Sequence, residues 1–253
     1  MKMHILSGGR LRMRKSIYFP DSERSETIEL PVSCTLLRHS QGNVLIDTGC
    51  HPITATDPEA RWGSMAKAMV PISAPEDNVI HGLAMLGLKP EDIDVVINSH
   101  FHSDHCGCNE FFKLATVFCH HRELEAASAK DSVQKGYLPI DWQQPMPVTT
   151  VEAEHDLFGD GRVTLLPLPG HTAGTLGTIV NLDRDGSFLM AADAIPLRDS
   201  LEREIIPRNT WDPELAAQSM EEVRRLQRLG ITVIYGHDAQ QWEELRKGPE
   251  AYE

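Results

Sequence analysis

Three histidines and an aspartate are packed into six residues, at His100, His102, Asp104 and His105. They follow 94–98, a short β-branched run that predicts a buried strand. Extended backbone alternates its side chains, so the first three of these residues can project to one side. His105 breaks that period, which suits a chain turning into a loop or helix. Imidazole and carboxylate are good ligands for Zn²⁺ and also for Fe²⁺, Mn²⁺ or Co²⁺. The segment therefore predicts a metal site, because the alternative, a polar loop rich in histidine by chance, leaves a costly set of desolvated groups.

Four further short motifs occur in order along the chain: Leu45-Ile46-Asp47-Thr48-Gly49, Pro169-Gly170-His171-Thr172, Ala192-Asp193 and Tyr235-Gly236-His237-Asp238. Together with the H-x-H-x-D-H segment, they resemble the metallo-β-lactamase superfamily over residues from about 43 to 238. A Gly-His-Thr turn alone would mean little, whereas five motifs in order are highly specific. The resemblance implies an α/β fold, a four-layer αββα sandwich, with two divalent metal ions.

The same resemblance implies a complete set of metal ligands. One metal is assigned to His100, His102 and His171, and the second to Asp104, His105 and His237, with Asp193 bridging the two. Two cations a few Å apart do call for a bridging carboxylate and a bridging water. Asp47 is expected to orient a ligand rather than to bind metal itself. Zinc is the expected ion, with Fe, Mn or Co as alternatives, since His/Asp sites accept several first-row ions.

A metal pair of this kind makes hydroxide available near neutral pH and polarises a carbonyl. No G-x-S-x-G element is present, so hydrolysis by a metal-bridging hydroxide is the economical mechanism. Segments 98–107, 236–242 and 6–11 look most like the lactonase branch of the superfamily, which includes N-acyl-homoserine lactonases. The resemblance thus implies opening of a lactone ring, with N-acyl-homoserine lactone (quorum quenching) as the first candidate. Asp104 is the expected proton shuttle to the leaving oxygen.

One position departs from the lactonase pattern. Members of that branch commonly carry a Tyr three residues after the bridging aspartate, where this chain has Pro196. Either another donor replaces that phenol or the preferred substrate differs. A hydrolase of another small lactone, an aryl ester or a thioester (glyoxalase-II-like) therefore stays open as an alternative. A metal-binding module without turnover is a further alternative, although every ligand position is filled.

The remaining histidines and the cysteines are expected to be structural. His120 and His121 should cap or line a loop next to a strand-like run, and Cys106 and Cys108 should pack rather than ligate. Segment 62–69 contains Trp62, Met65 and Met69, for which packing is favoured over lining an apolar entrance.

The elements that position the site can be partly predicted. Strand-like runs occupy 35–37, 43–46, 163–168, 176–182, 188–191 and 231–235, and a helical pattern covers 78–86. A later helix is expected from Asp212 as N-cap to Gly230 as stop, with Ala216, Met220, Val223, Leu226 and Leu229 on one face. Strands mixed with peripheral helices favour a layered α/β domain, a single one spanning 1–253.

Composition limits the partners. The 253 residues carry 24 Lys and Arg against 37 Asp and Glu, a net charge of −13, which disfavours nucleic acid and anionic membranes. No apolar run approaches the length of a membrane span, and no signal peptide is evident. Five scattered cysteines favour reduced thiols and the cytoplasm. The expected partner is a small lactone or ester, and a homodimer is implied by the resemblance only.

Overall fold

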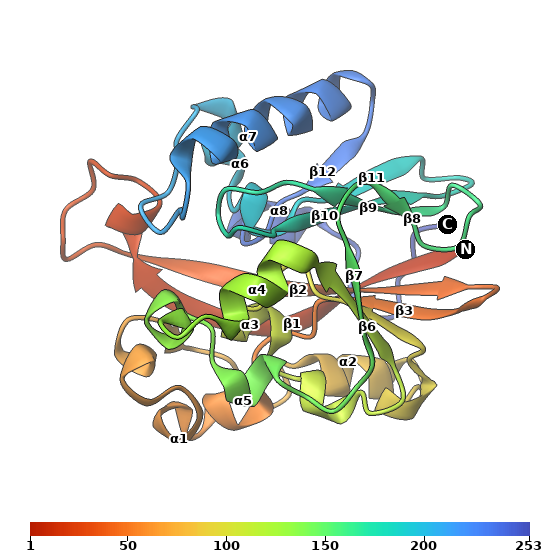
Figure 1. Cartoon of the computed structure of the whole chain (residues 1–253), viewed down its shortest axis with the longest axis horizontal. Coiled ribbons are helices and arrows are strands. Elements are labelled where there is room, and N and C mark those ends of the chain that lie inside the picture. Colours follow the sequence, from red (N-terminus) through yellow and green to blue (C-terminus); the bar gives the residue numbers. More distant parts are fainter.

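Two β-sheets lie face to face in the computed structural model, which describes residues 1–253 (Figure 1). The larger sheet has seven strands in the order β4 (Val70–Pro71), β1 (Lys2–Arg14), β2 (Thr27–His39), β3 (Gly42–Ile46), β5 (Val95–Ile97), β6 (Thr116–His120) and β7 (Val148–Val151). The smaller has five strands in the order β12 (Thr232–Ile234), β11 (Ser187–Met190), β10 (Leu176–Asn181), β9 (Val163–Pro167) and β8 (His155–Asp156). Both sheets mix parallel and antiparallel pairs.

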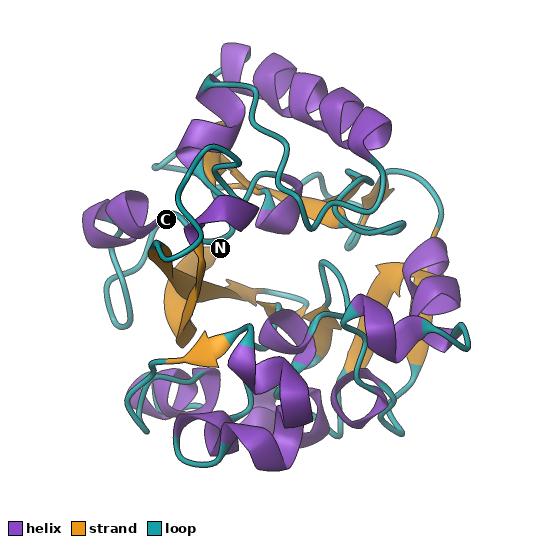
Figure 2. Cartoon of the chain, turned by 90° about the vertical axis from the view of Figure 1, so that its left-hand side faces the viewer, coloured by secondary structure: helices purple, strands orange, loops and turns teal.

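Helices cover the outer faces of both sheets, which gives the four layers of the αββα sandwich expected from the sequence (Figures 1 and 2). Helices α1 (Pro58–Trp62), α2 (Val79–Met85) and α5 (Pro139–Trp142) lie on the side of the larger sheet, and α6 (Arg198–Glu202) and α7 (Pro213–Arg228) on the side of the smaller. The others are α3 (Ser103–Cys106), α4 (His121–Ser128) and α8 (Ala239–Glu244). No helix is both long and apolar enough to cross a membrane.

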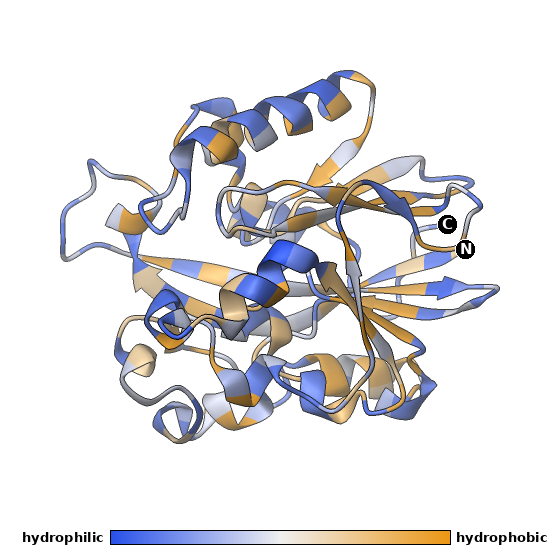
Figure 3. Cartoon of the chain, in the orientation of Figure 1, coloured by the Kyte–Doolittle hydropathy of each residue, from blue (hydrophilic) through white to orange (hydrophobic).

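The central strands are apolar on both faces because both faces are buried. In β3, Val44 and Ile46 pack into the core between the sheets, whereas Leu45 points the other way, into the core under α2. A third cluster joins the smaller sheet to α7 through residues such as Val223 and Leu189. Figure 3 shows the strands as largely apolar and the outward side of α7 as hydrophilic.

Helix α7 begins and ends as the sequence predicts. The Asp212 carboxylate accepts the N–H groups of Glu214 and Leu215, each at 3.0 Å, and Gly230 adopts a φ of +90° just past the end. The expected inner face is buried except for Leu229, which is 68% exposed. That prediction was wrong because the helix ends at Arg228, so the helical period no longer applies to Leu229.

The hairpin of β1 and β2 is longer than the sequence patterns indicate, with 13 residues in each strand. Its register shifts between Ser7 and Gly9, where the chain approaches the turn after β3. A Cβ added at Gly49, whose φ is +72°, would lie 2.5 Å from the Cα of Gly8, so only glycine fits there. This close approach fixes the Asp47-Thr48-Gly49 turn beneath the histidine cluster.

Candidate metal centre

The seven residues predicted as ligands converge at one end of the two sheets. His100, His102, Asp104 and His105 follow β5, and His171 lies in the β9–β10 turn. Asp193 lies in the short turn after β11, and His237 is the third residue after the end of β12. Their donor atoms form three overlapping groups in which all atoms lie within 4.8 Å of one another: His100, His102 and His171; His100, His105 and Asp193; and Asp104, His105 and His237. Strand ends from both sheets thus supply a single cluster.

Asp193 lies between the two histidine sets. Its Oδ1 is 2.9 Å from Nε2 of His237 and 3.3 Å from Nε2 of His105, whereas its Oδ2 is 3.4 Å from Nε2 of His171. The two oxygens of one carboxylate therefore face different sides of the cluster. On the far side, Oδ2 of Asp104 is 3.6 Å from Nε2 of His237.

The cluster fits divalent metal ions. Nε2 of His100, Nε2 of His105 and Oδ1 of Asp193 are buried without a hydrogen-bond partner, although buried polar atoms are normally paired. Burial lowers the pKa of His171 to about 4 and holds the pKa of His100 well below its ordinary value. Both imidazoles therefore present lone pairs at neutral pH, as metal ligands must. Histidine and aspartate together suit zinc and similar first-row ions.

The outward-facing ring nitrogens are held by fixed acceptors. His237 Nδ1 donates to the carbonyl of Pro31 at 2.9 Å, and His102 Nε2 donates to that of Lys135 at 3.1 Å. His105 Nδ1 donates to Oδ2 of Asp47 at 2.8 Å, as expected for an orienting carboxylate. Each such bond favours a proton on the outer nitrogen, so the inner nitrogen is the one that would ligate. Although burial opposes the shift, the Asp193 and Asp104 carboxylates raise the pKa of His105 and of His237, so these two rings would release a proton on binding metal.

Local structure at the motif differs from the sequence prediction in one respect. Helix α3 begins at Ser103, with His102 as its N-cap residue. Asp104 therefore lies in the first turn of a helix and does not share an extended stretch with His100 and His102. The chain turns two residues before the break in period at His105.

Two buried side chains near the cluster were missed from sequence. Glu123, in the first turn of α4, bonds to the loops that carry His102 and His171. Tyr18 is 2% exposed, and its hydroxyl donates only to Met13 Sδ at 3.6 Å. Burial and the charges of the Asp193 and Asp104 carboxylates raise the Tyr18 pKa well above its ordinary value. Neither residue belongs to a recognisable motif, so no sequence signal could have found it.

The residues predicted to be structural are placed accordingly. His120 caps α4 by accepting the N–H of Arg122 at 3.2 Å. Cys106 and Cys108 are fully buried, donate to backbone carbonyls and lie outside the three donor groups. Trp62 and Met69 pack around Tyr18 in a small apolar cluster, with Met65 at its edge.

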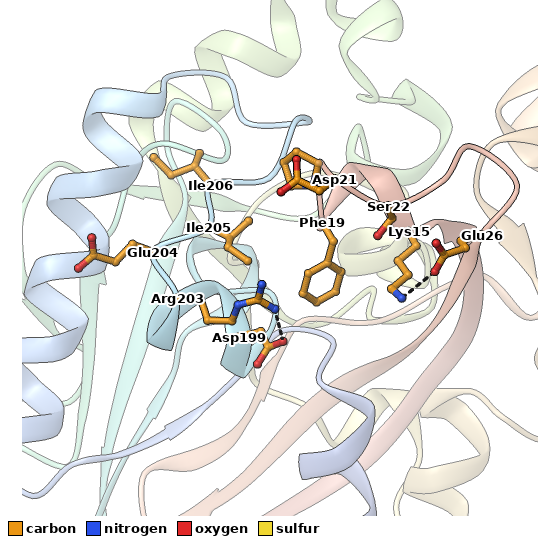
Figure 4. A pocket seen from close by; sticks show the side chains of 11 residues that line it. Lys15, Phe19, Asp21, Ser22, Glu26, Asp199, Arg203, Glu204, Ile205 and Ile206 are labelled. Carbon is orange, nitrogen blue, oxygen red and sulfur yellow. Dashed lines mark hydrogen bonds and ion pairs between the residues drawn. The ribbon is translucent and has the colours of Figure 1, made fainter.

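A cavity of about 290 Å³ opens beside His102 and His171 and is also lined by Ala126, Lys135, Tyr137, Thr172, Ala173, Arg208, Asn209, Thr210 and Trp211. A larger hollow of about 690 Å³ contains none of the seven donors (Figure 4). The two cationic side chains that line this hollow are already in ion pairs, Lys15 with Glu26 and Arg203 with Asp199. Phe19 lies between the two cations, each 5.9 Å from its ring. Of these two hollows, only the smaller borders predicted ligand residues.

Residues 27–237 match the sequence profile of the metallo-beta-lactamase superfamily, and the chain belongs to this superfamily. The N-acyl homoserine lactonase AttM of Azorhizobium caulinodans is 28% identical over 260 residues, covering 100% of this chain and 99% of its own. The N-acyl homoserine lactonase AiiA of Bacillus thuringiensis subsp. kurstaki is 28% identical over 252 residues, covering 98% of each chain. A crystal structure of N-acyl homoserine lactone hydrolase, with N-hexanoyl-L-homoserine bound at its catalytic metal centre, superposes with a TM-score of 0.89 at 26% identity over 99% of this chain and 98% of that one.

Proposed function

We propose that this protein is a dinuclear metal hydrolase that opens lactone rings, with N-acyl-homoserine lactones as the first candidate substrates. The observation that carries the proposal is the placement of Asp193, whose two oxygens face the two histidine sets. Full-length similarity to N-acyl homoserine lactonases supports the choice of substrate.

We assign the ligands from this geometry. His100, His102 and His171 would hold one ion, and Asp104, His105 and His237 the other, with Asp193 shared. Zinc is the proposed metal, because imidazole and carboxylate in a compact site suit it. Ions bound here would supply a Lewis acid for the ring carbonyl and an acidified water.

The protein's own groups must then move one proton. Ring opening joins a water oxygen to the carbonyl carbon, breaks the ring C–O bond and leaves an alkoxide that takes up a proton. The Asp104 side chain is 9% exposed and faces His237 and His105. In this position it would carry the proton from the water to the alkoxide. The product is a hydroxy acid.

The cavity beside His102 and His171 is the proposed site for the acyl part of the substrate. Tyr137, Ala126 and Trp211 give it apolar walls, while Lys135 and Arg208 add cationic groups at its lining. Its volume of about 290 Å³ suits a short acyl chain more than a long one.

Another small lactone, an aryl ester or a thioester is the second candidate substrate. Pro196 favours it, because a proline cannot offer the hydroxyl that the lactonase branch commonly has there. A hydroxyl donor from elsewhere in the chain, with Tyr18 as the first candidate, would favour lactones again as the substrate.

We also propose a cytoplasmic location, because all five cysteines are free thiols and a reducing compartment keeps them so. The homodimer implied by resemblance is a further proposal, which light scattering of the purified protein would test.

Metal analysis combined with a pH-stat substrate panel tests the main proposal. The panel compares short and long acyl-homoserine lactones, γ-lactones, aryl esters and thioesters. We expect two metal ions per chain, because Asp193 lies between two sets of donor atoms that could each hold an ion, and fastest turnover of an acyl-homoserine lactone. A folded protein that binds no metal would overturn the dinuclear site. Turnover of thioesters alone would replace the lactonase assignment with the second candidate.

A further inference from the structure

Glu123 is a buried carboxylate with no cationic partner. It is 0% exposed and forms no ion pair with a Lys or Arg side chain, a costly state for a carboxylate. Three groups donate to it: the N–H of Phe101 at 2.9 Å, the hydroxyl of Thr172 at 2.7 Å and the N–H of Gly174 at 3.1 Å. Burial raises the Glu123 pKa, and these bonds oppose that rise.

The three donors come from the two loops that carry the first set of metal ligands. Phe101 lies between His100 and His102, and Thr172 directly follows His171. One Glu123 oxygen takes the bond from the first loop, and the other takes both bonds from the second. The carboxylate therefore ties together two loops that approach only in the folded chain.

Helix capping does not explain this arrangement. Glu123 is the third residue of α4, where an acidic side chain can fold back onto the N-cap backbone in a capping box. Here the cap is His120, and both Glu123 oxygens are used by other segments. The second loop also packs tightly on the helix start, since a Cβ at Gly174 would lie 2.4 Å from the Glu123 N atom.

We propose that Glu123 is a positioning residue that sets the spacing of the His100–His102–His171 group and so strengthens metal binding at that group selectively. The inference rests on the proposed dinuclear site. A cation held by the three imidazoles would also offset the buried negative charge, and the other ligand group, on Asp104, His105 and His237, receives no bond from Glu123.

Glu123→Gln tests this in two backgrounds that isolate the ligand groups. With His237→Ala, the remaining strong site is the first group; with His171→Ala, it is the second. Zinc affinity is measured by competition with a chromophoric chelator, and Co²⁺ absorption spectra report the ligand geometry. We expect Glu123→Gln to weaken binding by about tenfold or more in the first background, as for other groups that orient ligands. In the second background we expect unchanged affinity. Equal weakening in both, or none in the first, would overturn the proposal.

Two further variants separate positioning from folding. Thr172→Val removes one donor to the carboxylate and should weaken the first group in the same direction, whereas Thr172→Ser should restore it. Asp156→Asn is the matched control, a carboxylate that accepts N–H groups of Phe158, Gly159 and Gly161 away from the centre, and should leave both affinities unchanged. If Glu123→Gln does not fold, a failure of Thr172→Val to weaken the first group would still refute the proposal. Absence of metal binding by the parent protein would instead count against the proposed function.

Discussion

Asp47→Asn should move the ring proton of His105 from Nδ1 to Nε2. The variant would thus remove a proposed ligand atom without removing a histidine. Asp47 is 4% exposed and accepts three bonds, from Ser99 N and Ser99 Oγ at 2.7 Å each and from His105 Nδ1 at 2.8 Å. An asparagine that keeps the Ser99 N–H bond turns its NH₂ group toward His105. Nδ1 must then accept, so the proton moves to Nε2, the atom that faces Asp104 and Asp193.

The size of the effect can be worked from these contacts. A hydrogen bond to a charged group contributes about 1.5–3 kcal/mol, which corresponds to about 10- to 100-fold in an equilibrium constant. In other metalloproteins, loss of a carboxylate that orients a metal-bound histidine lowers metal affinity by about 10–100-fold. We therefore expect Asp47→Asn to lower affinity at the Asp104–His105–His237 group by about 10- to 100-fold.

Titration of the metal-free protein with Zn²⁺ by calorimetry would measure this, with kcat recorded at each metal ratio. Ser99→Ala is the control for the Asp104–His105–His237 group, because it removes one bond to Asp47 and the contact with His100 Nδ1 but leaves the carboxylate and its bond to His105 in place. Its loss of affinity at that group should be several times smaller. Two full-affinity sites in Asp47→Asn would refute the reasoning, since His105 would then ligate whatever its outer partner.

Three other changes have defined outcomes. Asp104→Asn should lower kcat by about 100-fold or more with the fold intact, because general acid–base transfer contributes about 10²–10⁴; unchanged kcat would remove Asp104 as the shuttle. Tyr18→Phe should lower lactone kcat/KM by up to about tenfold, the weight of one hydrogen bond, while metal content stays constant; lost metal would mean a structural role. For pH, burial lowers the His4 pKa, so the unfolded chain takes up a proton that the folded chain resists, and stability falls as pH drops below the ordinary histidine value. His4→Phe should therefore lose less stability between pH 7 and pH 5, as measured by urea unfolding, and an equal loss would contradict this.

The seven candidate ligand residues could be selected from the sequence because each lies in a short local motif near a strand end, and the structure brings them together. The strand β5 and the turn at Asp47 are likewise local patterns of β-branched and glycine residues. The bounds of helix α7 could be predicted for the same reason, because its N-cap residue and its terminating glycine are close to the helix in sequence. Where a prediction depended on one element continuing, as at Leu229 or Asp104, the end of that element decided the outcome.

Only the tertiary structure decided how these residues meet. The two oxygens of Asp193 reach different histidines because the turn after β11 lies between the β9–β10 turn and the end of β12. Glu123 bonds to Thr172 across 49 residues, and Tyr18 comes under the charge of Asp193 from the opposite end of the chain. Residue type and spacing thus determined which atoms could bind metal. Long-range packing of two sheets decided their distances, their protonation and the buried carboxylate that ties their loops together, because these depend on neighbours that no local pattern records.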